Sequence, residues 1–263
     1  SISSYGYGAY LNNQFSNAVG GVTITNPSNY APFVFETGFF GSAPGLDGLR
    51  VLSYGNISIT NVISSSNRGN GIYLDNYAGG TGSGNISLTT TRVGFINILQ
   101  FNDLSGLVVR TNGTVTLSNI QAGDVDPIYG NDAYGADIQV LNVTTPKAVT
   151  LTGTNSFSSN VSGGLKIITN GPITLNNVTA DNNHNVANTA GGIGVQLDNT
   201  ASTAAFPQNV TINGTNGFSG NYSDGLNVNT YGLILLHNLT ANDNSHGFGA
   251  LIHNEGSTLP KSI

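Results

Sequence analysis

The segment most suited to chemistry is an acidic one, DVDPIYGNDAYGAD, which runs from residue 124 to residue 137. It carries carboxylates at Asp124, Asp126, Asp132 and Asp137, interleaved with glycine and asparagine. Carboxylates on a turn-rich segment are the ligands that a hard cation such as calcium prefers, although the closing bidentate glutamate of a complete calcium loop is missing. Asp124, Asp126 and Asp132 are therefore the candidate calcium ligands, with a solvated loop as the alternative. No other cofactor is expected.

The remaining acids and bases do not form a catalytic set. Glycoside hydrolysis uses two carboxyl groups on either side of one glycosidic bond. Asp75 and Asp198 instead lie in matching LDN segments, with Asn12 at the corresponding position, which is typical of structural turns. Arg50 and Lys166 could act as the base of a lyase, but no acidic cluster accompanies them, so we expect both to face solvent on strands. The sequence therefore predicts no enzymatic activity.

Zinc, nucleic acid and a membrane span are not expected either. The chain has no cysteine, and its four histidines follow no repeated spacing, which is unlike a zinc site. The net charge is −6 and the seven Lys and Arg residues are scattered, so the basic surface that binds nucleic acid is missing. No apolar run approaches the roughly 18 residues that a membrane helix needs.

Asn-x-Ser/Thr sequons recur along the chain, and in secreted proteins such sequons are glycosylation acceptors. Many of them follow simply from a composition rich in asparagine and threonine. The candidate acceptors are those expected in turns, such as Asn112 and Asn221.

An internal repeat carries these residues. The octapeptides GLRVLSYG, GLVVRTNG, GLKIITNG and GLNVNTYG begin at glycines spaced 58, 58 and 61 residues apart, namely Gly48, Gly106, Gly164 and Gly225. Thirteen residues after each glycine stands an asparagine followed by an aliphatic residue; these asparagines are Asn61, Asn119, Asn177 and Asn238. A period that is held to the residue indicates units that stack on one another.

Each repeat contains two coils. A second glycine-led segment lies between successive octapeptides, and these segments begin at Gly8, Gly71, Gly135, Gly192 and Gly249. Aliphatic residues two apart, with Thr, Ser or Asn between them, have the period of a β-strand rather than of a helix. Strand pairs recur about every 23 to 35 residues, which is one turn of a solenoid, so we expect roughly eight coils.

The asparagines that follow the octapeptides are expected to form a structural ladder. Each lies where the chain must bend between two inward aliphatic residues, and asparagine tolerates the left-handed conformation that a sharp corner needs. Identical amides in successive repeats can also hydrogen-bond along the stack. Replacing Asn177 with alanine should therefore cost stability, whereas Asn183, assigned to a polar excursion, should tolerate the same change.

With these coil motifs and asparagine-bearing turns, the chain resembles the right-handed parallel β-helix proteins of the pectin-lyase-like superfamily, of the large extracellular surface or adhesin type. The resemblance implies an all-β fold, a right-handed parallel β-helix, in a single domain over residues 1–263. Irregular coils would occupy 1–47, regular repeats 48–256 and a tail 257–263. The superfamily contains lyases, hydrolases, tailspikes and surface proteins, so the fold does not choose among functions.

Composition favours a structural role outside the cell. Only 8% of the residues are charged, against roughly 25% in an ordinary globular protein, and no capping helix is visible at either end of the repeat. Exposed strand edges template further pairing. We therefore expect an extracellular or cell-surface protein whose open ends meet another copy head to tail, with the tail 257–263 crossing into the neighbour, or meet a continuation of the same polypeptide. It would form filaments or be surface-attached, and adhere to a carbohydrate or cell-surface partner.

Two other functions stay open. In the first, the chain is a carbohydrate-binding or polysaccharide-degrading β-helix whose aromatic rings stack on sugars. The aromatic residues, for which packing beneath loops is the favoured alternative, are Tyr30, Phe33, Phe35, Phe39, Phe40, Tyr129 and Tyr134. In the second, ranks of threonine such as Thr23 and Thr25 bind ice. The variation in coil length argues against one flat repeating face and so disfavours ice binding.

Overall fold

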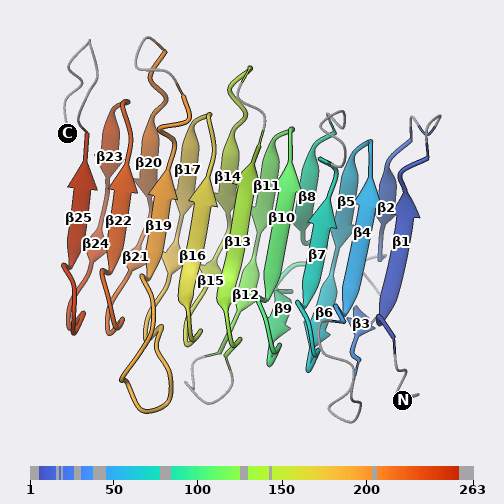
Figure 1. Ribbon diagram of the computed structural model, residues 1–263, viewed down its shortest axis with the longest axis horizontal. Coiled ribbons are helices and arrows are strands. Elements are labelled where there is room, and N and C mark those ends of the chain that lie inside the picture. Colours follow the sequence, from blue (N-terminus) through green and yellow to red (C-terminus); the bar gives the residue numbers. More distant parts are fainter. Residues whose placement is uncertain are drawn as a thin grey trace.

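The computed structural model describes residues 6–15, 18, 20–26, 31–37, 46–77, 84–124, 130–141, 144–202 and 206–254. In this part of the chain the regular secondary structure consists of β-strands alone, and these strands form three parallel sheets wound about a common axis (Figure 1). The prediction of an all-β, right-handed parallel β-helix of about eight coils is confirmed, because each sheet holds eight or nine strands. None of the described residues forms a helix that could cross a membrane.

Each coil contributes one strand to each sheet, in the order A, B, C. Sheet A consists of β1 (Ala9–Asn13), β4 (Leu49–Ser53), β7 (Ile72–Asp75), β10 (Leu107–Thr111), β13 (Tyr134–Val140), β16 (Gly163–Ile168), β19 (Val195–Asp198), β22 (Leu226–Asn229) and β25 (Ala250–His253). Sheet B consists of β2 (Val22–Ile24), β5 (Ile57–Thr60), β8 (Ile86–Thr89), β11 (Val115–Ser118), β14 (Val149–Thr152), β17 (Ile173–Asn176), β20 (Val210–Asn213) and β23 (Ile234–Leu236). Sheet C consists of β3 (Phe33–Phe35), β6 (Val62–Ser65), β9 (Asn97–Gln100), β12 (Ile120–Ala122), β15 (Asn155–Ser156), β18 (Val178–Thr179), β21 (Asn216–Gly217) and β24 (Leu239–Thr240).

The aliphatic pattern fixes how the coils stack. The octapeptides form β4, β10, β16 and β22, and the second glycine-led segments form the sheet A strands between them. Leu49 pairs with Ile72 and Val51 with Leu74, and all four side chains are fully buried. A shift of one residue would turn every one of these side chains to the solvent face. The core is therefore a continuous column of Leu, Ile and Val along the solenoid.

The asparagines that follow the octapeptides lie at the corner between sheets B and C. All four have the left-handed conformation, with φ of 56°, 53°, 48° and 47° at Asn61, Asn119, Asn177 and Asn238, so the expected bend is present. One coil lies between each pair of them, and their amides bond to that coil rather than to one another. Asn119 Oδ1 accepts from the Thr154 N–H and Asn177 Oδ1 from the Thr215 N–H, both at 3.0 Å.

A different column of asparagines, at the corner between sheets C and A, forms a continuous ladder. In this column each Nδ2 donates to the Oδ1 of the next member at 2.7–3.3 Å; the members are Asn67, Asn102, Asn131, Asn160, Asn183, Asn221 and Asn244. The Oδ1 of Asn183 also accepts from the Asn160 backbone N–H at 2.9 Å. Asn183 is fully buried, so its assignment to a polar excursion is wrong.

Differences in coil length do not disturb sheet B. The connections at the corners lengthen instead, as between β18 and β19 (Figure 1). From β2 to β23 the strands of sheet B stay aligned residue to residue. Varying coil length therefore does not break the repeat of this sheet, so the expectation that it would is wrong for sheet B.

Candidate functional site

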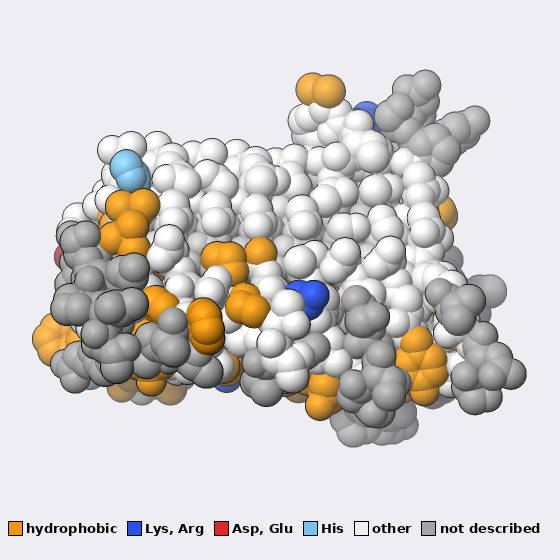
Figure 2. Space-filling view, turned by 90° about the horizontal axis from the view of Figure 1, so that it is seen from above, with side chains coloured by type: hydrophobic (Ala, Val, Ile, Leu, Met, Phe, Trp, Pro, Cys, Tyr) orange, Lys and Arg blue, Asp and Glu red, His pale blue; other side chains and the backbone are white. Residues whose placement is uncertain are grey.

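The outer face of sheet A carries the side chains that could take part in chemistry. In the described residues, only the strands of sheet A bear ionisable groups; those of sheets B and C carry hydroxyls, amides and apolar side chains. One outward column consists of Arg50, Tyr73, Val108, Asp137, Lys166, Gln196, Asn227 and Leu251. By contrast, very few charged side chains are seen among the described residues on the side of the molecule shown in Figure 2.

The two arginines of this face are held by acidic partners. Arg50 Nη1 lies 2.9 Å from Asp47 Oδ2, and its guanidinium sits 4.0 Å from the centre of the Tyr73 ring. Arg110 forms an ion pair with Asp137, whose carboxylate is largely buried. Both arginines are therefore structural, and neither is placed to accept a proton.

Tyr73 is the aromatic centre of this cluster. Burial, together with the nearby Asp75 carboxylate, raises the pKa of the Tyr73 phenol above its usual value. The phenol is therefore protonated at neutral pH, so it can donate a hydrogen bond but cannot act as a general base there. Tyr73 is engaged with the Arg50 guanidinium and, through its phenol at 3.4 Å, with Asp75 Oδ2, which fits a structural cluster.

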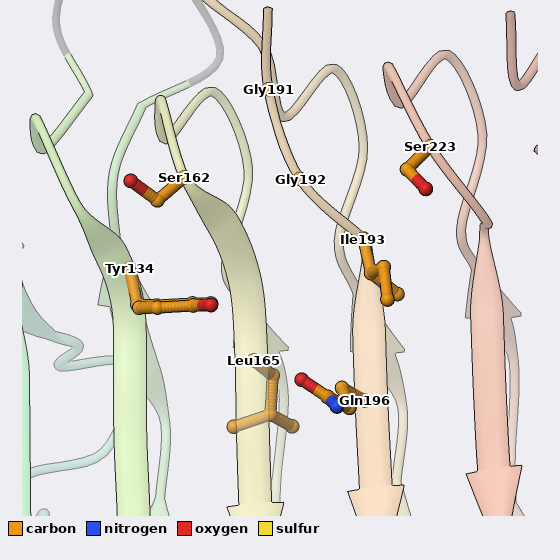
Figure 3. A pocket seen from close by; sticks show the side chains of 8 residues that line it. All are labelled: Tyr134, Ser162, Leu165, Gly191, Gly192, Ile193, Gln196 and Ser223. Carbon is orange, nitrogen blue, oxygen red and sulfur yellow. The ribbon is translucent and has the colours of Figure 1, made fainter. Parts of the chain in front are cut away.

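A cavity of about 270 Å³ opens beside the same face, near the start of β13, β16 and β19 (Figure 3). It is lined by Tyr134, Ser162, Leu165, Gly191, Gly192, Ile193, Gln196 and Ser223. The Tyr134 ring extends toward β16 in Figure 3, and Lys166 Nζ lies 5.6 Å from its centre. The lining offers an aromatic ring, an amide and two hydroxyls but no carboxylate. Such groups could stack on and hydrogen-bond to a neutral polar molecule.

The described aspartates of the acidic segment have different surroundings. Asp126 lies outside the described residues, and Asp137 belongs to the ion pair on sheet A. Asp132 lies in the connection before β13, where burial and the neighbouring Asp103 raise its pKa. No group of three or more His, Asp or Glu side chains that could hold a metal is found in the part of the chain described here. Calcium binding by Asp124, Asp126 and Asp132 stays a prediction.

Several other candidate residues have structural positions. Asp75 Oδ1 accepts from the Tyr77 N–H and Asp198 Oδ1 from the Thr200 N–H, at 2.8 and 2.9 Å, which confirms that the LDN segments are turns. Asn112 and Asn221 are buried. Asn221 Nδ2, the atom that a glycan would modify, donates to Asn244 Oδ1 at 3.1 Å, so glycosylation there would require this bond to be lost.

Sequence reasoning missed both the Arg50–Tyr73 contact and the cavity. The contact joins adjacent coils, and the signal for it was the alignment of GLRVLS with GIYLDN, which places Tyr73 beside Arg50. Of the aromatic candidates, Tyr134 lines the cavity, while Tyr30, Phe39, Phe40 and Tyr129 lie outside the described residues. Comparison with protein-family models, with curated proteins and with solved structures finds no match to this chain.

Proposed function

We propose that the protein is a structural extracellular β-solenoid, surface-attached or filament-forming, that associates through its ends. The observation that carries this proposal is the open apolar core at the first coil. Leu11 and Phe33 point inward, yet they are 38% and 43% exposed. Their partners in the next coil, Val51 and Val62, are fully buried. The strand edges and apolar side chains of this end would gain pairing and burial from a further coil.

The surface composition supports a location outside the cell. Charged side chains are scarce, and nearly continuous backbone pairing leaves few segments that a protease could open. The resemblance to surface and adhesin-type β-helix proteins points the same way, and adhesion to a carbohydrate or cell-surface partner is part of the proposal.

Light scattering as a function of protein concentration tests the association. Wild-type chain should increase in mass with concentration, whereas Leu11→Asp/Phe33→Asp should remain a monomer because a buried, unpaired carboxylate is costly. Val34→Asp is the matched control, since Val34 lies on the same strand but points outward and is 55% exposed. A wild-type monomer at every concentration would refute association through these ends.

A second candidate function is carbohydrate binding at the cavity beside sheet A. The specific observation is the combination of the Tyr134 ring with the amide of Gln196 and two serine hydroxyls, which can stack on and hydrogen-bond to a sugar. A glycan array should then show binding that is lost in Tyr134→Ala and Gln196→Ala but kept in Asn227→Ala, a change on the neighbouring strand β22. Equal signals from all four proteins would exclude this site.

We also propose that the protein is not an enzyme. The carboxylates of sheet A form an ion pair or cap turns, which supports a structural role for them. Assays on pectin and alginate should give no product above background. Product formation that disappears in Asp124→Asn or Asp126→Asn would favour a calcium-dependent lyase instead.

A further inference from the structure

The outer face of sheet B is a two-dimensional array of hydroxyl groups. One column, aligned residue to residue across six successive strands, consists of Ser58, Ser87, Thr116, Thr150, Thr174 and Thr211. A second column lies two residues further along the strands and includes Thr89, Ser118 and Thr152, whereas Thr60, at this position of β5, is buried and its hydroxyl accepts from the Asn26 N–H at 3.2 Å. The strands β8, β11 and β14 thus each present two hydroxyls in the same register.

The array is regular and stiff. Neighbouring strands are about 4.7–4.9 Å apart, and outward residues on one strand are roughly 6.6 Å apart. The inward neighbours of the outward residues, such as Val149, Leu151 and Ile173, are fully buried, which holds each strand in place. Threonine has few side-chain rotamers because it is branched at Cβ, and Ser58 and Ser87 hydroxyls hydrogen-bond across the coils at 3.1 Å. Little conformational freedom would be lost when a ligand binds.

The side chains on the outer face of sheet B limit the kind of ligand that can bind there. None of the sheet B strands in the described residues carries a charged or aromatic side chain, so a charged ligand has no counter-charge and a sugar ring has no stacking partner. What remains is a neutral, rigid lattice of hydroxyls and methyls. The spacing between strands is close to the shortest lattice repeat of hexagonal ice, so successive coils can hold water in an ice-like order.

We propose that the outer face of sheet B binds ice. Each threonine supplies a hydroxyl that replaces a water of the crystal surface and a methyl group whose burial against the crystal is favourable. Many weak contacts add up because the array presents them together in one register. This inference concerns a different surface from the solenoid ends and does not depend on the proposed function.

Ice recrystallisation and ice-crystal shaping by purified protein test the proposal, with Thr150→Lys/Thr174→Lys as the disruptive variant. Ser156→Lys/Thr179→Lys is the matched control, because it adds the same charge to the same two coils on the neighbouring sheet C. Wild type and control should inhibit recrystallisation and shape crystals, and the sheet B variant should lose both effects while its circular dichroism stays unchanged.

Three results would overturn the proposal. The first is a folded wild-type protein that neither shapes ice nor slows recrystallisation. The second is an equal loss of activity in both lysine variants, which would show that sheet B is not the binding face. Pull-down by crystalline cellulose that is lost only in Thr150→Lys/Thr174→Lys would reassign the face to a polysaccharide and so contradict ice binding.

Discussion

Asparagine is the residue on which this solenoid depends most, and it serves in two ways. At the corner between sheets B and C it adopts positive φ, which asparagine tolerates better than most other residues. At the corner between sheets C and A its amide both donates and accepts, so each side chain can hydrogen-bond to the next one along the whole ladder. Aspartate at such a position could not donate, and its charge would be buried.

The ladder residue Asn183 provides the first test. Its Oδ1 accepts from both the N–H and the Nδ2 of Asn160, at 2.9 and 3.3 Å. Asn183→Ala removes this acceptor, and with it both hydrogen bonds, inside a buried corner, and should lower the free energy of unfolding by about 2–4 kcal/mol. Asn182→Gly is the control, because Asn182 is exposed and has φ of 55°, a conformation that glycine adopts freely. Equal shifts in urea midpoint for the two variants would contradict the ladder.

Asp181 gives a prediction about pH. Burial raises the pKa of its carboxyl, and a hydrogen bond from the Ser219 N–H at 2.6 Å opposes the shift only in part. The carboxyl of Asp181 loses its proton at a lower pH in the unfolded chain than in the folded protein. Between these two pKa values the unfolded state is favoured as the pH rises, so the free energy of unfolding falls with increasing pH. Asp181→Asn keeps the Oδ1 acceptor and avoids this loss.

Thermal melts should therefore show that the Tm of Asp181→Asn, measured relative to the Tm of wild type, is higher at pH 7 than at pH 3. A difference in Tm that is the same at both pH values would mean that the charge of Asp181 plays no part.

At the scale of the strand, the glycines that mark the repeat are explained by the asparagine ladder. A Cβ on Gly135 would lie 2.8 Å from Asn160 Nδ2 and 2.8 Å from the carbonyl oxygen of Gly164. The equivalent positions Gly106 and Gly194 are equally close to Asn131 and Asn221. A sheet A strand can therefore begin beside the ladder only where the residue has no side chain.

Gly135→Ala tests this relation between strand and ladder. The added methyl must displace a backbone carbonyl or a ladder amide, so unfolding should become easier by about 1–3 kcal/mol. Gly20→Ala is the control, because a Cβ there meets no atom within 4 Å, and it should change stability by less than about 0.5 kcal/mol. Denaturant unfolding of both variants gives the comparison, and a neutral Gly135→Ala would show that the corner can relax.

The strands could be predicted from sequence, and the ladder could not, for a physical reason. Inward aliphatics repeat every second residue and the octapeptides keep a nearly fixed period, so sheet membership followed directly. Successive ladder asparagines are instead separated by 35, 29, 29, 23, 38 and 23 residues, because corner connections differ in length while the corner itself stays in place. The cavity depends on Gly191 and Gly192 of one such connection, which has no period at all.

At the scale of the whole molecule, the two ends of the solenoid are not equivalent. In the described residues sheet A has nine strands and sheets B and C have eight, so β25 extends one strand beyond β23 and β24. A second copy whose β1 pairs with β25 would leave one strand position open in each of the other sheets. Association through the ends therefore needs a further segment; the tail 257–263, predicted to cross into the neighbour, lies outside the described residues.

Hydrogen exchange measured at low and high protein concentration tests this picture of the whole molecule. In a stack where each coil contacts only its neighbours, the end coils open most easily, so amides of β1, β3 and β25 should exchange faster than those of β10 to β17. Raising the concentration should slow exchange at both ends and leave the central coils unchanged, because association covers only the ends. In Leu11→Asp/Phe33→Asp the ends should stay fast at every concentration. Protection that is already uniform along the dilute wild-type chain would mean that the ends are covered within a single molecule, and association would then lose its driving force.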